Sequence, residues 1–135
     1  MTDTNTKDIE LIASYLKKMD IDPEQTKKAP NIWRLEQNKA EIFIIVAGGF
    51  IIFQSKIMAL PKSNISTFYR KLLELNENVE ESLGASFGIN KHNEIILKML
   101  RPSTNLGLNE FIYYLTSIAF VAEKQMDMLK ERFND

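Results

Sequence analysis

The chain has 135 residues, a net charge of −1 and no cysteine. Its 44% of hydrophobic residues is typical of a globular protein, and the length predicts one domain over residues 1–135, with a flexible tail at residues 1–6. The missing cysteines exclude disulfides and thiolate zinc sites, and the lack of excess Lys and Arg argues against a nucleic-acid partner.

The N-terminal sequence MTDTNTKD has neither the basic start nor the apolar core of a secretion signal. The apolar runs of the chain are far shorter than the about 20 residues that a membrane-spanning helix needs. We therefore expect a cytoplasmic protein that does not insert into a membrane.

The first half of the chain predicts one helix followed by three strands. Apolar residues recur at helical spacing over residues 7–19, and the segment Asp20–Pro23 ends that helix because proline disfavours helical geometry in the residue before it. Alternating apolar and polar residues over Asn31–Gln37 predict a half-buried strand. Two apolar runs, Ala40–Ala47 and Phe50–Ile57, predict two more strands.

Between these two runs, Gly48 and Gly49 predict a tight turn, because glycine reaches the positive φ angles that such turns require. In the first run Ile44 points to one face of the resulting hairpin, while Phe43 and Ile45 point to the other. A hairpin in a small domain usually has one face in water. A hairpin that is apolar on both faces therefore predicts a second cover, from the chain or from a partner.

The second half of the chain predicts a helix, two strands and a long final helix. The first helix begins at Ser63 or Asn64 and frays between Asn76 and Gly84. The strands are predicted over Ser86–Ile89 and Glu94–Arg101, and the final helix over Asn109–Phe133. The predicted buried stripes are Ile65, Phe68, Tyr69, Leu72 and Leu73 in the first helix, and Phe111, Leu115, Ile118, Ala122, Met126, Leu129 and Phe133 in the second.

The final helix is apolar on more than one side in its first half. Besides the main stripe, Tyr113, Tyr114, Phe120 and Val121 occupy the opposite side. A helix that is apolar all round is normally buried all round. Either the other helices of the chain wrap this segment, or a partner covers it.

Strands in separate runs, joined by short turns, predict an antiparallel sheet. The fold class is therefore α+β, with a sheet of about five strands and the element order α-β-β-β-α-β-β-α. Trp33 lies on an alternating strand and is either a core residue or an anchor for a partner. The candidate residues for a dimer or partner interface are Tyr113, Tyr114, Phe120, Val121, Phe43, Ile45 and Trp33.

No catalytic or metal-binding pattern is visible in the sequence. His92 is the only histidine and lies in a predicted polar turn, where an exposed role is usual. The paired carboxylates Glu80 and Glu81 lie at a polar helix end, where glutamates are usually solvated. We therefore predict a protein that is not an enzyme, with no catalytic residue, no metal ligand and no cofactor.

Two stretches of the sequence resemble a known family. They are WRLEQNKAEIFIIVAGGFIIFQSKIMALP and FYRKLLELNENVEESLGASFGINKHNEIILKMLRP, preceded by a helix and followed by a long amphipathic helix. In element order and in these residues the chain resembles the YbjN family, which is related to the class I type III secretion chaperones, such as the Tir chaperones. The resemblance extends from about Ile9 to Phe133.

The resemblance implies a homodimer that holds an extended segment of a client protein in apolar grooves and at an exposed strand edge. With the lack of catalytic groups, it predicts a non-enzymatic protein-binding module. One alternative is a YbjN-like regulatory or ligand-sensing domain, with an apolar pocket between the sheet and the final helix. A second alternative is an enzyme whose site includes Asn109, Tyr113 and Tyr114.

Overall fold

The computed structural model describes the backbone of residues 2–133 and the side chains of residues 5–133. Within these residues the helices are α1 (Thr2–Lys18), α2 (Pro23–Thr26), α3 (Ile65–Glu77), α4 (Val79–Ser82) and α5 (Leu108–Phe133). The strands are β1 (Lys27–Ala29), β2 (Ile32–Gln37), β3 (Ala40–Ala47), β4 (Phe50–Ala59), β5 (Ser86–Ile89) and β6 (Glu94–Pro102). The predicted α+β class with an antiparallel sheet is confirmed, with six strands in place of about five.

Several elements differ from the prediction. Helix α1 begins at Thr2, so residues 2–6 are helical and not a tail; the apolar pattern that located this helix begins later than the helix itself. Helix α2 and strand β1 lie between the predicted first helix and the predicted strand Asn31–Gln37, where the sequence predicted no element. There the Asp22 side chain accepts a hydrogen bond from the backbone N–H of Glu24 at 2.9 Å, and Pro23 fills the first helical position, so a short turn of helix is stabilised locally.

All neighbouring strands are antiparallel, in the order β1-β2-β3-β4-β6-β5. The β3–β4 turn has the predicted form, since Gly48 and Gly49 both have positive φ angles, of 56° and 83°. Two successive positive φ angles match the twist of an antiparallel hairpin. In the strand order, β4 lies in the middle of the sheet, between β3 and β6.

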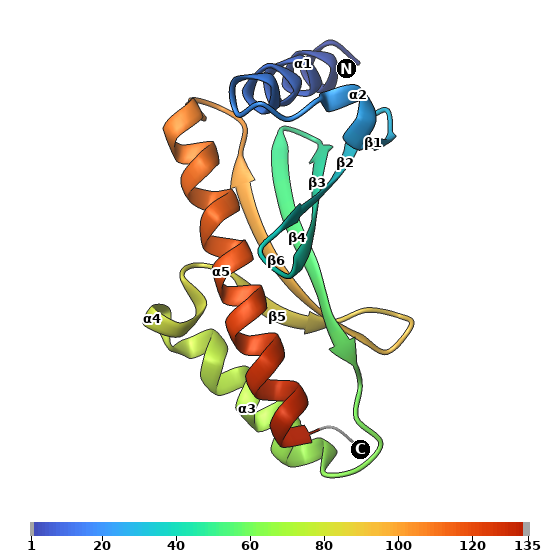
Figure 1. The fold of residues 1–135 in the computed structure, drawn as a ribbon, viewed down its shortest axis with the longest axis vertical. Coiled ribbons are helices and arrows are strands. Elements are labelled where there is room, and N and C mark those ends of the chain that lie inside the picture. The colour runs from blue at the N-terminus through green and yellow to red at the C-terminus, as the bar shows by residue number, and fades with distance from the viewer. Residues whose placement is uncertain (1, 134–135) are drawn as a thin grey trace.

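The hydrophobic core lies between α5 and one face of the sheet, which we call the inner face. Trp33, Ile44 and Phe53 point to this face and are fully buried. The stripe predicted for the final helix is buried against them, apart from Met126, which is partly exposed. Figure 1 shows α5 running along the sheet, with α1 across its upper end and α3 and α4 beside its lower half.

Helices α1 and α3 pack at the two ends of α5. The hydroxyl of Tyr15 in α1 donates a hydrogen bond to the carbonyl oxygen of Leu106 at 2.6 Å, and its ring lies 5.5 Å from that of Phe111. The ring of Phe68 in α3 lies 5.1 Å from that of Phe133. These contacts hold α1 and α3 on the same side of the sheet as α5.

Replacement of Phe111 by Ala tests this core. Phe111 is fully buried between Tyr15 and Phe53, so we expect Phe111→Ala to lower the free energy of unfolding by about 3–5 kcal/mol. Urea denaturation followed by circular dichroism measures the change. The control is Phe120→Ala on the exposed side of the same helix, for which we expect a loss below about 1 kcal/mol. Equal losses in the two variants would contradict the assignment of the helix faces.

Candidate protein-binding surfaces

The face of the sheet opposite α5 carries a row of aliphatic side chains. Antiparallel register places Ile32 of β2 beside Ile45 of β3, Ile45 beside Ile52 of β4, and Ile52 beside Leu100 of β6. Leu100 is 48% exposed, the three isoleucines are partly exposed, and none of the four belongs to the hydrophobic core. Neighbouring strands lie close enough for such side chains to form one continuous apolar strip.

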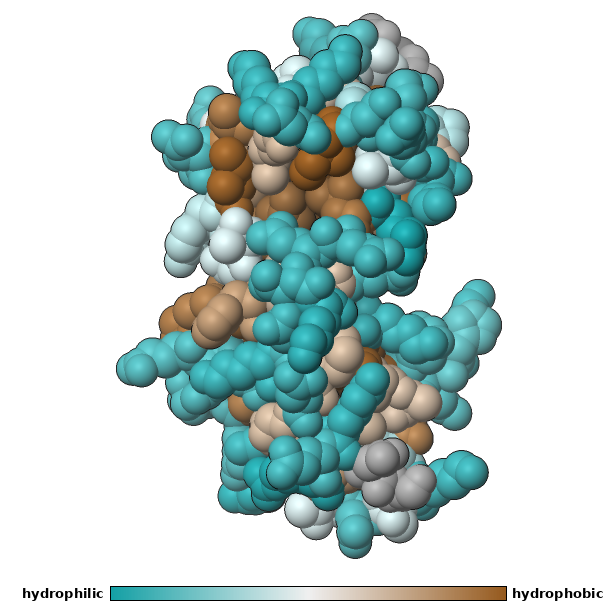
Figure 2. All heavy atoms as spheres, in the orientation of Figure 1, coloured by the Kyte–Doolittle hydropathy of each residue, from teal (hydrophilic) through white to brown (hydrophobic). Residues whose placement is uncertain are grey.

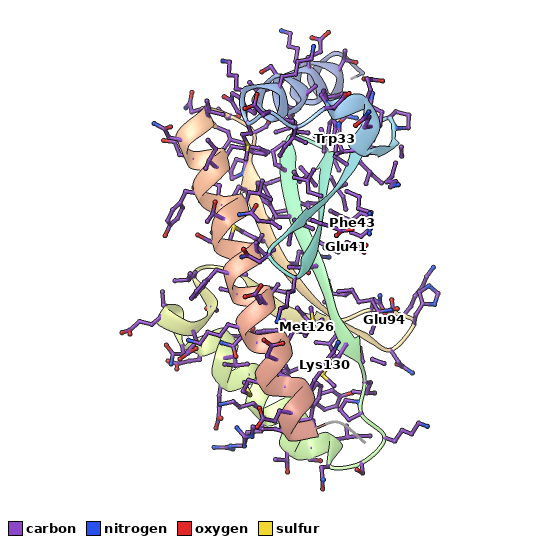
Figure 3. All side chains as sticks on the ribbon, viewed as in Figure 1. Trp33, Glu41, Phe43, Glu94, Met126 and Lys130 are labelled. Carbon is purple, nitrogen blue, oxygen red and sulfur yellow. The ribbon has the colours of Figure 1, made fainter. Side chains whose placement is uncertain are left out.

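Aromatic residues extend this strip on both sides. Phe43 of β3 lies on the same face as Ile45, and Phe50 of β4 is 41% exposed. We call the surface formed by Ile32, Phe43, Ile45, Phe50, Ile52 and Leu100 the open face. Its polar border beside Phe43 is formed by Arg34, whose guanidinium pairs with Glu41 and, at 3.2 Å, with Glu36. Figure 3 shows Glu41 and Phe43 next to each other on the hairpin.

The predicted interface residues do not form one surface. Phe43 and Ile45 lie on the open face, whereas Trp33 and Val121 are fully buried and cannot contact a partner in this fold. Trp33 is a core residue because alternate residues of β2 face α5. Val121 also belongs to the hydrophobic core, so it does not lie on the exposed side of α5 with Tyr113 and Phe120.

The remaining three candidates lie on α5, on the other side of the sheet from the open face. Tyr113 and Phe120 are 61% and 54% exposed. Tyr114 is partly buried, with its ring 6.3 Å from that of Phe53 and 4.8 Å from the Arg101 guanidinium carbon. Figure 2, which views this side, shows apolar surface in the upper half beside the first half of α5 and below α1, and mostly hydrophilic surface lower down.

Helix α3 carries a further apolar surface that the sequence analysis treated as core. Of its predicted stripe, only Phe68 and Leu72 are buried. Ile65, Tyr69 and Leu73 are 37%, 39% and 67% exposed, and we call them the α3 stripe. Their spacing of four residues places them on one side of the helix. The sequence did carry a signal for this surface: the apolar residues of α3 span a wider arc of the helix than one contact with the rest of the chain can bury.

The two outer edges of the sheet, formed by β1 and β5, are protected. The side chain of Asn76 in α3 bonds both backbone groups of Phe87 in β5, accepting from its N–H at 2.6 Å and donating to its carbonyl oxygen at 3.2 Å. Strand β1 has only three residues, an irregular register and a proline directly after it. Short strands, prolines and side chains that cap an edge all discourage pairing with another chain.

The model of the family described as CesT_Tir_1 matches residues 5–132. The chain belongs to this family. The predicted resemblance to the Tir chaperones is thereby confirmed, and it covers almost the whole chain.

Solved structures place the fold in the same group. The chain is similar to one in the heterodimeric ExoU–SpcU complex from the type III secretion system of Pseudomonas aeruginosa, with a TM-score of 0.69, 11% identity, and coverage of 91% of this chain and 98% of that one. A chain of the HopA1–SchA chaperone–effector complex gives a TM-score of 0.67 at 12% identity, with 97% of both chains covered.

YbjN from E. coli, the other predicted resemblance, gives a TM-score of 0.55 at 13% identity, with 89% of this chain and 86% of that one covered. At these identities the likeness establishes a shared fold. A search of curated proteins by sequence finds no match.

The described side chains offer little for catalysis. Within residues 5–133 no group of three or more His, Asp or Glu residues could hold a metal ion. His92 is exposed in the turn between β5 and β6. In the same part of the chain, no helix is both long and apolar enough to cross a membrane. Apolar surface is therefore the most distinctive feature of this structure.

An ion pair at the far end of β4 predicts a pH dependence of stability. The Lys56 ammonium lies 2.6 Å from a Glu94 carboxylate oxygen. The hydrogen bond that Lys56 donates is the largest cause that lowers the pKa of Glu94 below its usual 4.5, and the hydrogen bond from Asn90 is the second. Because folding lowers this pKa, the carboxylate adds stability above pH 4.5 that is lost as the pH falls through the lower pKa of the folded state. Glu94→Gln removes that contribution.

We therefore expect Glu94→Gln to be less stable than the unmodified chain at neutral pH, and the difference to shrink at about pH 3. Urea denaturation at both pH values measures it. The control is Glu131→Gln, an exposed carboxylate outside the described ion pairs, for which we expect no such pH-dependent difference. A difference for Glu94→Gln that is unchanged in acid would refute the ionic origin of the effect.

Proposed function

We propose that this protein is a non-enzymatic, homodimeric binding module that holds an extended segment of a client protein. The observation that carries the proposal is the open face, a continuous apolar surface across four strands with no described helix packed on it. Contiguous apolar surface on a water-soluble domain marks a site of interaction. Membership of the CesT_Tir_1 family and a fold similar to a chain of a chaperone–effector complex support the same function.

An extended client segment suits the shape of the open face. The row from Ile32 to Leu100 crosses the strands, so a segment laid along it would meet an apolar side chain at each strand. The ion pair of Arg34 with Glu41 would border such a segment with charge. Hydrogen bonding to Glu41 raises the pKa of Arg34 further, so the guanidinium stays charged at this border.

The α3 stripe supports the dimer. Ile65, Tyr69 and Leu73 occupy one side of one helix, and such a stripe can pack against the same stripe of a second copy about a two-fold axis. A stable interface buries roughly 800 Å² on each partner, so other residues near α3 must contribute. Ile89 of β5, which is 46% exposed, lies on the strand that α3 contacts.

Two alternatives gain less support. A ligand-sensing domain needs an enclosed apolar pocket between the sheet and α5. Around Phe53 and Phe111 this region is filled, with the two rings 5.6 Å apart and no exposed surface, and the space of about 630 Å³ between β4 and the last turns of α5 is an open groove. An enzyme near Asn109, Tyr113 and Tyr114 needs converging ionisable groups, and Tyr113 points to solvent.

Size-exclusion chromatography with light scattering tests the dimer. We expect the unmodified chain at tens of micromolar to have twice the 15.6 kDa mass of one chain, and Leu73→Asp to give a folded monomer, because a carboxylate at the interface would have to be buried without a partner. The comparison variant is Phe120→Asp on α5, which we expect to remain dimeric. A dimer broken by Phe120→Asp but not by Leu73→Asp would place the interface on α5 instead.

Binding to an array of peptides tests the client site. We expect the unmodified chain to retain peptides with alternating apolar residues, and Ile45→Asp to weaken this binding by about tenfold or more, because it places a charge in the apolar row. The matched control is Val79→Asp, which changes an exposed apolar residue of α4, away from the open face. Equal effects of the two substitutions would remove the open face as the binding surface.

A further inference from the structure

We propose that Arg101, at the end of β6, and the tyrosines beside it bind a carboxylate that is attached to an apolar or aromatic group. Such a carboxylate occurs in free organic acids and at the C-termini of protein chains, and a titration separates the two sources. The site lies on the α5 side of the sheet, across from the open face. The inference does not depend on the proposed function.

The side chain of Arg101 projects from β6 toward α5. In the register Arg101 lies opposite Ile51 of β4, which is fully buried on the inner face, and opposed residues of two strands share one face. Strand β5 pairs with β6 only up to Lys98, so no described strand lies outside the Arg101 end of β6. Arg101 therefore lies at an edge of the layer between the sheet and α5, where it is partly exposed.

Three contacts hold the guanidinium in place. Its carbon lies 4.8 Å from the centre of the Tyr114 ring, and its Nη1 donates a hydrogen bond to the carbonyl oxygen of Leu100 at 2.8 Å. Its Nη2 lies against the backbone of Gly84, in the connection from α4 to β5 that Figure 1 shows beside α5. A guanidinium that is already fixed loses less conformational freedom when it binds a ligand.

Gly84 is suited to this contact in two ways. A Cβ atom at this position would lie only 2.7 Å from Nη2 of Arg101, and the φ angle of +88° favours glycine. A side chain here would therefore displace the guanidinium from its place.

The guanidinium has free donors and no described counter-ion. Nε and Nη2 of Arg101 have no acceptor among the described side chains, and Arg101 forms no ion pair with them. Two carboxylates on neighbouring helices have other partners. Glu110 accepts a hydrogen bond from the backbone N–H of Gly107 at 2.9 Å, and Glu81 pairs with Lys124 at 3.0 Å. The N–H groups of one guanidinium edge match the two oxygens of a carboxylate, so this edge suits such a ligand.

Aromatic side chains beside the guanidinium define the rest of the ligand. The ring of Tyr113 lies 5.9 Å from that of Tyr114 and is 61% exposed. Phe120, seven residues further along the same side of α5, is 54% exposed. Exposed tyrosines next to an arginine are typical of sites that bind a partner. An apolar or aromatic group next to the carboxylate would contact Tyr113, whereas an inorganic anion would leave this surface in water.

Nuclear magnetic resonance of the arginine Nε–H groups in the full chain tests the inference. The probes are 3-phenylpropionate, its amide, and an acetylated Leu-Phe dipeptide with a free or an amidated C-terminus. We expect both free acids to shift the Arg101 signal and to bind at least about tenfold more tightly than their amides, which lack the charge. A preference of about tenfold for the dipeptide acid would assign the site to a chain terminus, and the reverse order to a free acid.

Substitutions separate the charge from its placement, with saturation-transfer signals of 3-phenylpropionate as the measure of binding. Arg101→Gln is expected to abolish binding, and Arg101→Lys, which keeps the charge without the fork, to weaken it about tenfold. The control is Arg70→Gln, which changes an exposed arginine of α3 and is expected to leave binding unchanged. Gly84→Ala is expected to weaken binding by displacing the guanidinium. Tyr114→Leu, which keeps an ordinary backbone, is expected to weaken it by removing the stacked ring.

Three results would overturn the inference. The first is equal binding of the acids and their amides, or binding that persists in Arg101→Gln. The second is a shift of the Arg101 signal by inorganic phosphate at lower concentration than by 3-phenylpropionate, since the aromatic surface would then play no part. The third is a change of oligomeric mass in Arg101→Gln, which would assign Arg101 to an interface between copies. None of them bears on the open face, which Ile45→Asp tests separately.

Discussion

The structure depends on one imbalance: the sheet is apolar on both faces, and the chain covers only one of them. Helix α5 buries Trp33, Ile44 and Phe53 on the inner face, and α1 and α3 hold the two ends of α5 through Tyr15 and Phe68. All of the long helices are thereby used on one side. None of the helices α1, α3 and α5 lies on the open face, so among the described residues its apolar side chains stay at the surface.

The elements with strong local signals could be predicted from the sequence. The hairpin at Gly48 and Gly49 followed from the need for positive φ angles, and the buried stripe of α5 followed from helical spacing. Elements held by single side-chain contacts could not be predicted. Helix α2 depends on the cap that Asp22 provides. Strand β1 depends on pairing with β2, and its three residues are too few to show the alternating pattern that predicts a strand.

The candidate surfaces were only partly predictable, because periodicity identifies apolar faces but not what covers them. The alternation in β3 correctly separated Phe43 and Ile45 from the inner face. The same reasoning treated Ile65, Tyr69 and Leu73 as core residues. A wide apolar arc on a helix gives the same sequence pattern whether the chain buries the whole arc or leaves one side of it at the surface. Val121 shows the opposite error, because the chain covers it by itself, and of the two readings of Trp33 the structure bears out the core residue.

The open face and the α3 stripe lie on different parts of the molecule, and this arrangement lets them act together. The α3 stripe lies beyond β5, whose edge Asn76 closes, so a second copy placed there approaches one end of the strand order. The open face lies across the sheet from α5 and extends from β2 to β6. A dimer formed through α3 therefore leaves the open face accessible on each copy. An extended client would then lie along the apolar row of one copy without competing with the partner subunit, and two copies would offer it two such rows in place of one.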